Sequence, residues 1–189
     1  MSEFSRDGDM YSLGLSLDEA HILINLVEQL LELLGEGDFN HHYDESDPLA
    51  QLMAQLKAAP EEITVPEDPV LLRLLPSAYA DPESAADFRR YTEPTLRGKK
   101  KRTLVQVRSA LEIIVDADRA GIIEDLDSET WLMAINDLRL ALSVRLEVTP
   151  DSYDHFETLS EEDPQKPIFA VYFWLGWLQS SLLNLLSNG

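Results

Sequence analysis

Apolar residues recur along most of this chain at the three- and four-residue spacing that places side chains on one face of a helix. The clearest case begins at Ser16 and Glu19, which match the capping box of a helix start, and ends at Gly35. No segment alternates convincingly between apolar and polar residues. The pattern therefore predicts an all-α fold, a single-domain bundle of about six helices over residues 16–189, behind a flexible N-terminus at residues 1–15.

The remaining predicted elements follow from prolines, glycines and changes in hydrophobic spacing. Pro94 is expected to separate two helices, because proline removes a backbone donor and crowds the preceding turn. The acidic stretch at residues 149–165 is expected to be a loop. In chain order, the other expected elements are a short helix from Pro48, a Pro-rich connector at residues 60–69, a short apolar helix in "VLLRLLPSAY", a helix from Pro82 to Arg90, a basic helix from Thr95 to Ala120, a helix after Asp127 or Ser128, and a last helix in "PIFAVYFWLGWLQSSLLNLL".

Charge is distributed very unevenly along the sequence. The chain has a formal net charge of −20, yet residues 89–108 hold eight Lys or Arg and a single acid, Glu93, which makes this window +7. An exposed helix end that offsets nearby acidic helices would explain such a run, and so would a surface for nucleic acid or an acidic partner. The candidate contact residues in this run are Arg97, Lys99, Lys100, Lys101, Arg102 and Arg108.

The basic run also has a register that bears on its role. Leu104, Val107 and Leu111 form an apolar stripe, and extending it backwards by four and then three residues reaches Lys100 and Arg97. These two cations are therefore expected on the core side of the helix. Because an unpaired charge is costly to bury, we expect an Asp or Glu carboxylate beside at least one of them.

A separate polar strip lies on the helix predicted after residue 128. Asn136, Arg139 and Ser143 follow at steps of three and four residues, next to an apolar face one position earlier in the sequence. Such a strip can form a hydrogen-bonded network within the fold or the wall of a binding groove. Both interpretations are open at this point, and the structural one is favoured.

The last predicted helix is almost entirely apolar. Its nineteen residues from Ile168 to Leu186 carry no charge, which is close to the length that spans a bilayer. Polar residues in its second half and the lack of a flanking basic cluster favour a core or interface helix over membrane insertion. Its aromatic residues Phe173, Trp174 and Trp177 are candidates for a two-fold dimer interface, and the alternative is a central helix covered by its own chain.

Several classes of chemistry find no support in the sequence. There are no cysteines, which excludes disulfides, thiolate metal sites and thiol switches, and no phosphate-binding glycine loop, catalytic serine elbow or zinc-protease motif occurs. His41, His42, Asp44 and Glu45 are metal-ligand types, but a solvated acidic loop explains them better. We therefore expect no catalytic residues, no metal and no cofactor. Residues 1–15 lack the pattern of a signal peptide, so a cytoplasmic location is expected.

Three strings in the chain resemble a known family. They are "LLRLLPSAY", "DFRRYTE" and "NDLRLALSVRL", which occur in this order within residues 71–149, and the last is the most specific. The chain resembles an actinobacterial family long known as a domain of unknown function, which includes the actinomycete oxidative stress regulators. That resemblance implies a small, cytosolic, mostly helical bacterial protein with a proposed role in redox-responsive transcription, and it supplies no catalytic residue set.

Together, these observations favour a non-enzymatic regulatory or adaptor protein. We expect it to be linked to transcriptional or stress regulation through contact with a protein partner, with the transcription machinery as a candidate. Direct DNA binding by the basic helix at residues 97–108 is the alternative, and an uncharacterised enzyme is a distant third. Thiol sensing requires cysteine, so that mechanism cannot operate in this chain.

Overall fold

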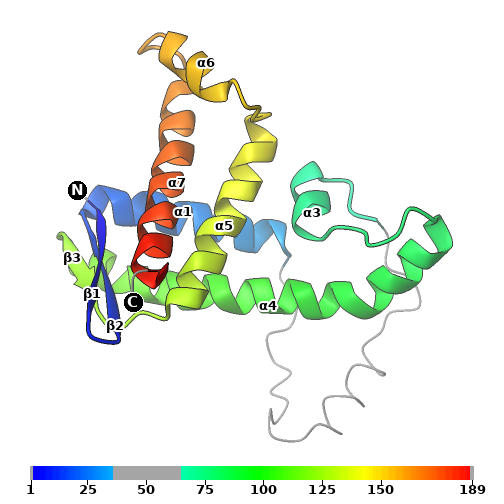
Figure 1. Cartoon of the computed structure of the whole chain (residues 1–189), viewed down its shortest axis with the longest axis horizontal. Helices are drawn as coiled ribbons and strands as arrows, with labels where there is room; N and C mark the ends of the chain where they lie inside the picture. Colours follow the sequence, from blue (N-terminus) through cyan, green and yellow to red (C-terminus); the bar gives the residue numbers. More distant parts are fainter. Residues whose placement is uncertain (1, 36–64, 188–189) are drawn as a thin grey trace, which may run out of the picture.

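The computed structural model describes residues 2–35 and 65–187. Within these residues the chain forms six helices and one three-stranded antiparallel sheet, so the all-α prediction is wrong. Figure 1 shows the sheet at one end of a helical body. The elements, in chain order, are β1 (Glu3–Asp7), β2 (Met10–Leu15), α1 (Leu17–Leu33), α3 (Pro69–Leu74), α4 (Pro82–Asp116), β3 (Gly121–Ile123), α5 (Ser128–Arg145), α6 (Ser152–Thr158) and α7 (Lys166–Ser187).

The sheet is built around an N-terminal hairpin, in residues where the sequence predicts a flexible terminus. β1 and β2 pair antiparallel and leave a two-residue loop of Gly8 and Asp9. Gly8 has a φ of +60°, which glycine adopts without steric cost at the first position of a tight hairpin loop. β2 turns Leu13 and Leu15 into the core, and β3 completes the sheet by pairing with β2. The sequence does not predict these strands, because β1 and β2 have only five and six residues and such short segments show no clear alternation.

Helix α1 begins where the sequence predicts. The Ser16 side chain accepts a hydrogen bond from the Glu19 backbone, and the Glu19 carboxylate accepts one from the Ser16 backbone at 2.8 Å, so the capping box is confirmed. Burial alone would raise the pKa of Glu19, but hydrogen bonds from Ser16 and Ser2 hold this pKa below its ordinary value. The cap thus fixes the start of α1 and ties it to the first residues of the chain.

Helix α4 runs without interruption through Pro94, so the predicted break between two helices is wrong. Proline removes one helical hydrogen bond, but Pro94 is exposed and the carbonyl that loses its donor can be hydrated. The preceding residue, Glu93, forms ion pairs with Arg89 one turn earlier and with Arg97 one turn later. These pairs hold the two halves of the helix together across the proline.

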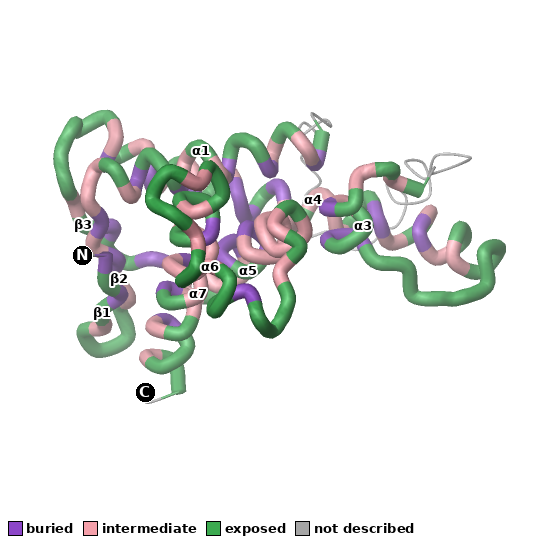
Figure 2. Tube along the Cα trace, turned by 90° about the horizontal axis from the view of Figure 1, so that it is seen from above, coloured by how far each residue is buried: buried purple, intermediate pink, exposed green. Residues whose placement is uncertain are grey.

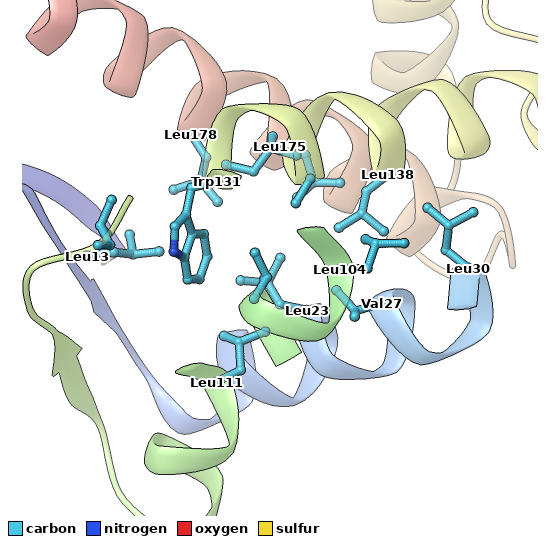
Figure 3. Packing of buried hydrophobic residues seen from close by; sticks show 14 of the residues in the cluster. Leu13, Leu23, Val27, Leu30, Leu104, Leu111, Trp131, Leu138, Leu175 and Leu178 are labelled. Carbon is cyan, nitrogen blue, oxygen red and sulfur yellow. The ribbon is translucent and has the colours of Figure 1, made fainter. Parts of the chain in front are cut away.

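One hydrophobic cluster joins the sheet to the main helices. α1 packs on α4, α5 packs on α3, α4 and α7, and α7 also packs on β1. Figure 3 shows Leu23 of α1, Leu104 of α4, Leu138 of α5 and Leu175 of α7 within this cluster. In Figure 2 the buried residues gather where these elements meet, whereas α6 and the start of α4 are mostly exposed. The shared core therefore fixes the mutual positions of α1, α4, α5 and α7.

Helices α5 and α7 run side by side in opposite directions and rise past α1 to a tip that carries α6 (Figure 1). α6 lies within residues 149–165, where the sequence predicts a loop. Aromatic rings of α6 and α7 pack together there, and the ring centroids of Phe156 and Tyr153 each lie 5.3 Å from that of Phe173. These contacts cover one side of the upper part of α7.

Two expectations fall outside the described residues. They are the short helix from Pro48 and the metal-ligand types His41, His42, Asp44 and Glu45. Of the connector expected at residues 60–69, the described part runs from residue 65, and α3 begins at its end behind an Asp68 cap.

Candidate functional site

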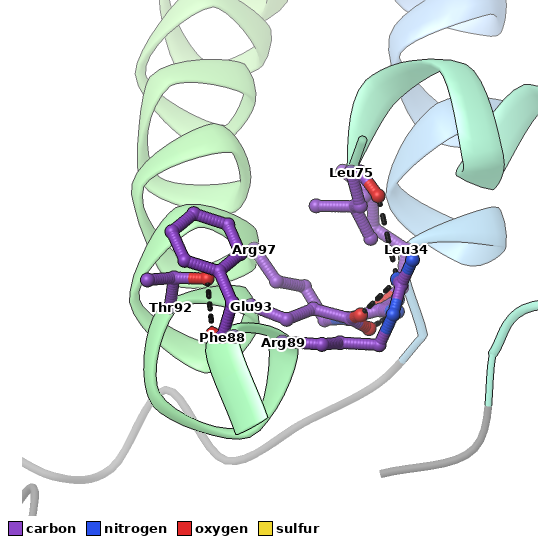
Figure 4. A network of polar contacts seen from close by, with 7 residues as sticks. All are labelled: Leu34, Leu75, Phe88, Arg89, Thr92, Glu93 and Arg97. Atoms are coloured by element: carbon purple, nitrogen blue, oxygen red, sulfur yellow. Dashed lines mark hydrogen bonds and ion pairs between the residues drawn. The ribbon is translucent and has the colours of Figure 1, made fainter. Parts of the chain in front are cut away.

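The first half of α4 is tied into the fold by a buried charge network. Glu93 accepts hydrogen bonds from Arg89 at 2.6 Å and from Arg97 at 2.7 Å, and both Arg89 and Glu93 are buried. Arg97 also donates to the carbonyl of Leu34 at the end of α1 (2.8 Å), and Arg89 donates to that of Leu75 at the end of α3 (3.3 Å). Figure 4 shows these groups converging between the three helices. The network therefore serves the C-terminal carbonyls of α1 and α3, which lack helical donors.

Lys100 forms a second internal ion pair, with Asp137 of α5. Its Nζ atom lies 2.7 Å from the Asp137 carboxylate, which is buried. Burial raises the pKa of Asp137 above its ordinary value, and Lys100 opposes that rise. Together with the Arg97–Glu93 pair, this contact confirms the expectation that acids lie beside Arg97 and Lys100. Both cations join α4 to other parts of the fold.

The remaining basic candidates divide between core and surface. Lys101 is buried, and Arg108 pairs with Glu112 at 3.3 Å. Lys99 and Arg102 are exposed. The cations of α4 thus spread over several faces of the helix, whereas a phosphate-binding surface would need them on one side.

The polar strip of α5 lies against α7. Arg139 donates to the side-chain oxygen of Gln179, and the Gln179 amide donates to Asn136 at 3.4 Å. The Arg139 guanidinium also lies over the Tyr172 ring, 5.2 Å from its centroid. Ser143 instead donates to a carbonyl one turn earlier in its own helix. The structure therefore brings Asn136 and Arg139 into one network between two helices and leaves Ser143 outside it.

The three aromatic interface candidates on α7 have different surroundings. Phe173 packs in the aromatic cluster with α6, and Trp174 lies against β1, where its Nε1 donates to Ser2 at 2.7 Å. Trp177 is exposed, with 44% of its surface accessible to solvent. A self-association surface on α7 would therefore centre on Trp177, because the other two side chains stabilise the fold of their own chain.

In the part of the chain that the structure describes, α7 leaves several large apolar side chains exposed to solvent. Leu178 and Leu182 point into the core, and the exposed large apolar residues of the helix are Ile168, Trp177, Leu183 and Leu186. Of the described helices, α7 is the one that is long and apolar enough to cross a bilayer by length and composition, with a mean hydropathy of 1.3. Here its core contacts place it in the same hydrophobic cluster as α1, α4 and α5.

An open groove lies where α1, α5 and α7 meet, and sequence reasoning missed it. It has a volume of about 540 Å³. Its lining residues are His21, Ile22, Asn25, Leu26, Leu142, Pro167, Ile168 and Val171. A signal for the groove exists in α1, which has apolar residues on two faces: Leu23 and Val27 are buried in the core, whereas Ile22 is 37% exposed. The described residues leave this second face without a full cover.

Metal-ligand side chains are scattered over the described residues. In residues 2–35 and 65–187, no three His, Asp or Glu side chains lie close enough together to hold a metal ion. His21 lines the groove, and His155 of α6 packs on Phe169 with 5.8 Å between ring centroids. The described part of the chain is thus mostly helical, and it combines an N-terminal hairpin and internal charge networks with an apolar groove that is open to solvent.

Comparison with known proteins identifies the family. The chain belongs to the family described as "Domain of unknown function (DUF2017)", which matches residues 1–186. A Mycobacterium tuberculosis protein named "Oxidative stress regulator AosR" is 31% identical over 96% of this chain and 84% of that protein. A protein of the same name from Mycobacterium bovis has the same identity and coverage. The family expected from the sequence is thus confirmed, and no solved structure matches the chain.

Proposed function

We propose that this chain is a non-enzymatic regulatory protein, which acts in the cytoplasm in transcriptional or stress regulation by contacting a protein partner. The names of the mycobacterial relatives support the regulatory role, because the similarity extends over nearly the whole chain. The observation that carries protein contact is the uncovered apolar surface of α7 with its adjoining groove. Exposed apolar side chains beside a groove are typical of protein interaction sites.

Direct DNA binding receives less support. A helix that neutralises several phosphates needs its cations free and on one side. Arg97 and Lys100 instead face Glu93 and Asp137 at 2.7 Å. The net charge of −20 would further repel a phosphate backbone from the rest of the surface.

The regulatory role can be tested in the source organism. Transcripts of cells that lack the chain are compared with those of wild-type cells under peroxide, and we expect changed levels for a defined set of genes. A complementing copy with Lys99→Glu and Arg102→Glu tests the alternative, because these exposed cations are the ones a nucleic acid could reach. We expect this copy to restore the wild-type pattern.

Binding to duplex DNA is measured in parallel with the purified chain at several salt concentrations. We expect no binding near physiological salt. Steeply salt-dependent binding that the charge-reversed variant loses would favour the DNA alternative. Unchanged transcripts in cells without the chain would contradict the regulatory role itself.

The proposed regulation works without thiol chemistry. The chain has no cysteine, so oxidants can modify methionines such as Met10 and Met133 but cannot form a disulfide. Diamide treatment of the purified protein is expected to leave its mass, oligomeric state and partner binding unchanged. A diamide-dependent change in any of these three properties would show that the expectation is wrong.

A further inference from the structure

The groove between α1, α5 and α7 has the character of a site for side chains of another protein. Its lining is apolar apart from His21 and Asn25, and the rim residues Ile22 and Ile168 are 37% and 42% exposed. The volume of about 540 Å³ lies in the range of ligand sites. However, two polar residues at an open groove offer little to orient a small polar ligand. A row of apolar side chains presented by a helix could contact this lining without needing further polar partners.

The surroundings of the groove are negatively charged. Exposed Asp18 lies one turn before Ile22 on α1, exposed Glu28 lies one turn after Asn25, and Glu162 is exposed just before α7 begins. Such a rim would attract a cationic partner and disfavour an anionic one.

Two cations close to the groove in sequence are paired with acids of the same chain. Lys166, next to the lining residue Pro167, is paired with Glu161 at 2.7 Å. Arg145, one turn after Leu142 on α5, is paired with Asp68 at 2.6 Å. Each of these cations is thus already matched by an acid of the same chain.

We propose that this groove binds an amphipathic helix of a partner protein, with apolar residues at i, i+3 or i+4 and i+7 facing the groove and Lys or Arg facing its acidic rim. The inference rests on the proposed function, because it names the surface and the partner chemistry of that protein contact. A second copy of this chain is a poor occupant of the groove, because Arg97 and Lys100 of its basic helix are used within its own fold.

The test uses the full-length chain and a fluorescent Leu/Lys peptide whose leucines follow the same helical spacing. Binding is measured by fluorescence anisotropy. Ile22→Gln and Ile168→Gln are each expected to weaken binding by about tenfold, because they remove apolar contact at the groove. The matched control is Trp177→Gln, which changes an equally exposed apolar residue half a turn around α7 from Ile168, and it is expected to alter binding less than about twofold.

A second peptide tests the charge of the partner. It keeps every leucine and replaces each Lys with Glu, and we expect it to bind at least about tenfold more weakly. Backbone amide shifts in NMR spectra, on adding the Leu/Lys peptide, are expected to concentrate at α1 and the start of α7. Equal binding by all variants, equal binding of both peptides, or shifts confined to α4 would each overturn the proposal.

Two further measurements separate this inference from its alternatives. If sedimentation shows a concentration-dependent dimer that Ile22→Gln and Ile168→Gln abolish, the groove belongs to a second copy and the proposal fails. Capture from a lysate is then compared for the wild-type chain and the variant with both substitutions. A partner retained equally by both would overturn the groove as its site and leave the proposed regulatory function standing.

Discussion

Helices α4 and α7 both carry residues that are unusual for their surroundings, because α4 buries charges and α7 exposes large apolar side chains. α4 buries charged side chains, including Arg89, Glu93 and Lys101, whereas α7 leaves large apolar side chains such as Trp177 and Leu183 exposed. On α4 the cost of burying Arg89 and Glu93 is offset within the same chain, by the ion pairs and carbonyl contacts of the network. On α7 the exposed surface has no comparable partner in the described residues.

The two helices therefore differ in whether the rest of the described chain accounts for their unusual residues. Arg89 and Arg97 of α4 bind the ends of α3 and α1, so these charged side chains join the three helices. The exposed apolar side chains of α7 have no such partner among the described residues, which is why we propose that another molecule contacts them. From the sequence, the basic run of α4 and the aromatic residues of α7 are both candidate contact surfaces. Five experiments can break or sharpen the contrast.

The largest effect is expected from Glu93→Gln. This change leaves the guanidinium groups of Arg89 and Arg97 without their shared carboxylate in a buried setting. We expect the free energy of unfolding, measured in urea, to fall by about 4 kcal/mol. Glu112→Gln is the matched control, because it breaks an exposed Arg–Glu pair of the same spacing on the same helix and should cost less than about 0.5 kcal/mol. Equal losses in the two variants would remove the distinction between a buried joint and a surface pair.

Two neighbouring positions on α7 are expected to differ next most. Leu178→Ala opens a cavity in the core and should lower the free energy of unfolding by about 3 kcal/mol. Trp177→Ala removes a larger but exposed side chain and should cost less than about 1 kcal/mol. Urea unfolding of both variants checks this. A larger loss for Trp177→Ala would mean that this side chain belongs to the core of the chain.

Self-association through α7 stays a prediction, and Trp177 is the residue that tests it. We expect a dimer in sedimentation at micromolar concentration and a monomer for Trp177→Glu, since one charge on each copy would meet at a two-fold interface. Co-sedimentation with phosphatidylcholine vesicles checks the membrane alternative, for which we expect no binding. A wild-type chain that is monomeric at every concentration would rule out this interface.

A smaller effect with a pH signature is expected from Lys100→Met. The variant leaves Asp137 buried without its cation, and we expect a loss of about 2 kcal/mol near neutral pH. Burial already raises the pKa of Asp137, and without Lys100 this pKa rises further. The folded state then binds a proton more readily than the unfolded chain, so the defect should shrink as the pH falls through the raised pKa. A defect that is independent of pH would contradict this reasoning.

The double variant Lys100→Met with Asp137→Leu is the control for the ion pair. Replacing both charges with apolar side chains removes the need for pairing, so most of the lost stability should return. If the double variant is as unstable as the sum of the single ones, the cost lies in packing and not in the unpaired charge.

The smallest effect is expected at the exposed cations of α4. Lys99→Gln and Arg102→Gln should change the free energy of unfolding by less than about 0.5 kcal/mol, because both side chains are exposed. The same variants should bind the Leu/Lys peptide as the wild-type chain does. A loss of peptide binding in either variant would move the contact surface from α7 back to α4.

Features of this fold that depend on residues close together in the sequence could be predicted from it. The Ser16 cap and the pairing of Arg97 and Lys100 followed from spacing alone. The hairpin also had a local signal, since Gly8-Asp9 suits a two-residue hairpin loop with glycine at its first position, but the strands beside it are short and their alternation is easily overlooked.

Two other features depend on contacts between distant segments, and no window of sequence contains them. Pro94 predicts a break when it is read locally, yet Arg89 and Arg97 on either side of it donate to the carbonyls of Leu75 and Leu34, which lie at the ends of other helices. The groove likewise exists only because α1 meets the α5–α7 pair at a corner. Its residues come from three helices, and each looks unremarkable within its own.

The contact between Ser2 and Trp174 has a consequence for how the chain folds during synthesis. These residues lie 172 positions apart, and the Trp174 indole donates to the Ser2 hydroxyl at 2.7 Å. The hairpin is synthesised long before α7, the helix that packs on β1. Until α7 emerges, the apolar side of the hairpin lacks that cover. The sheet end of the molecule therefore gains this cover only after α7 has been synthesised, and its assembly depends on contacts between residues that are distant in sequence.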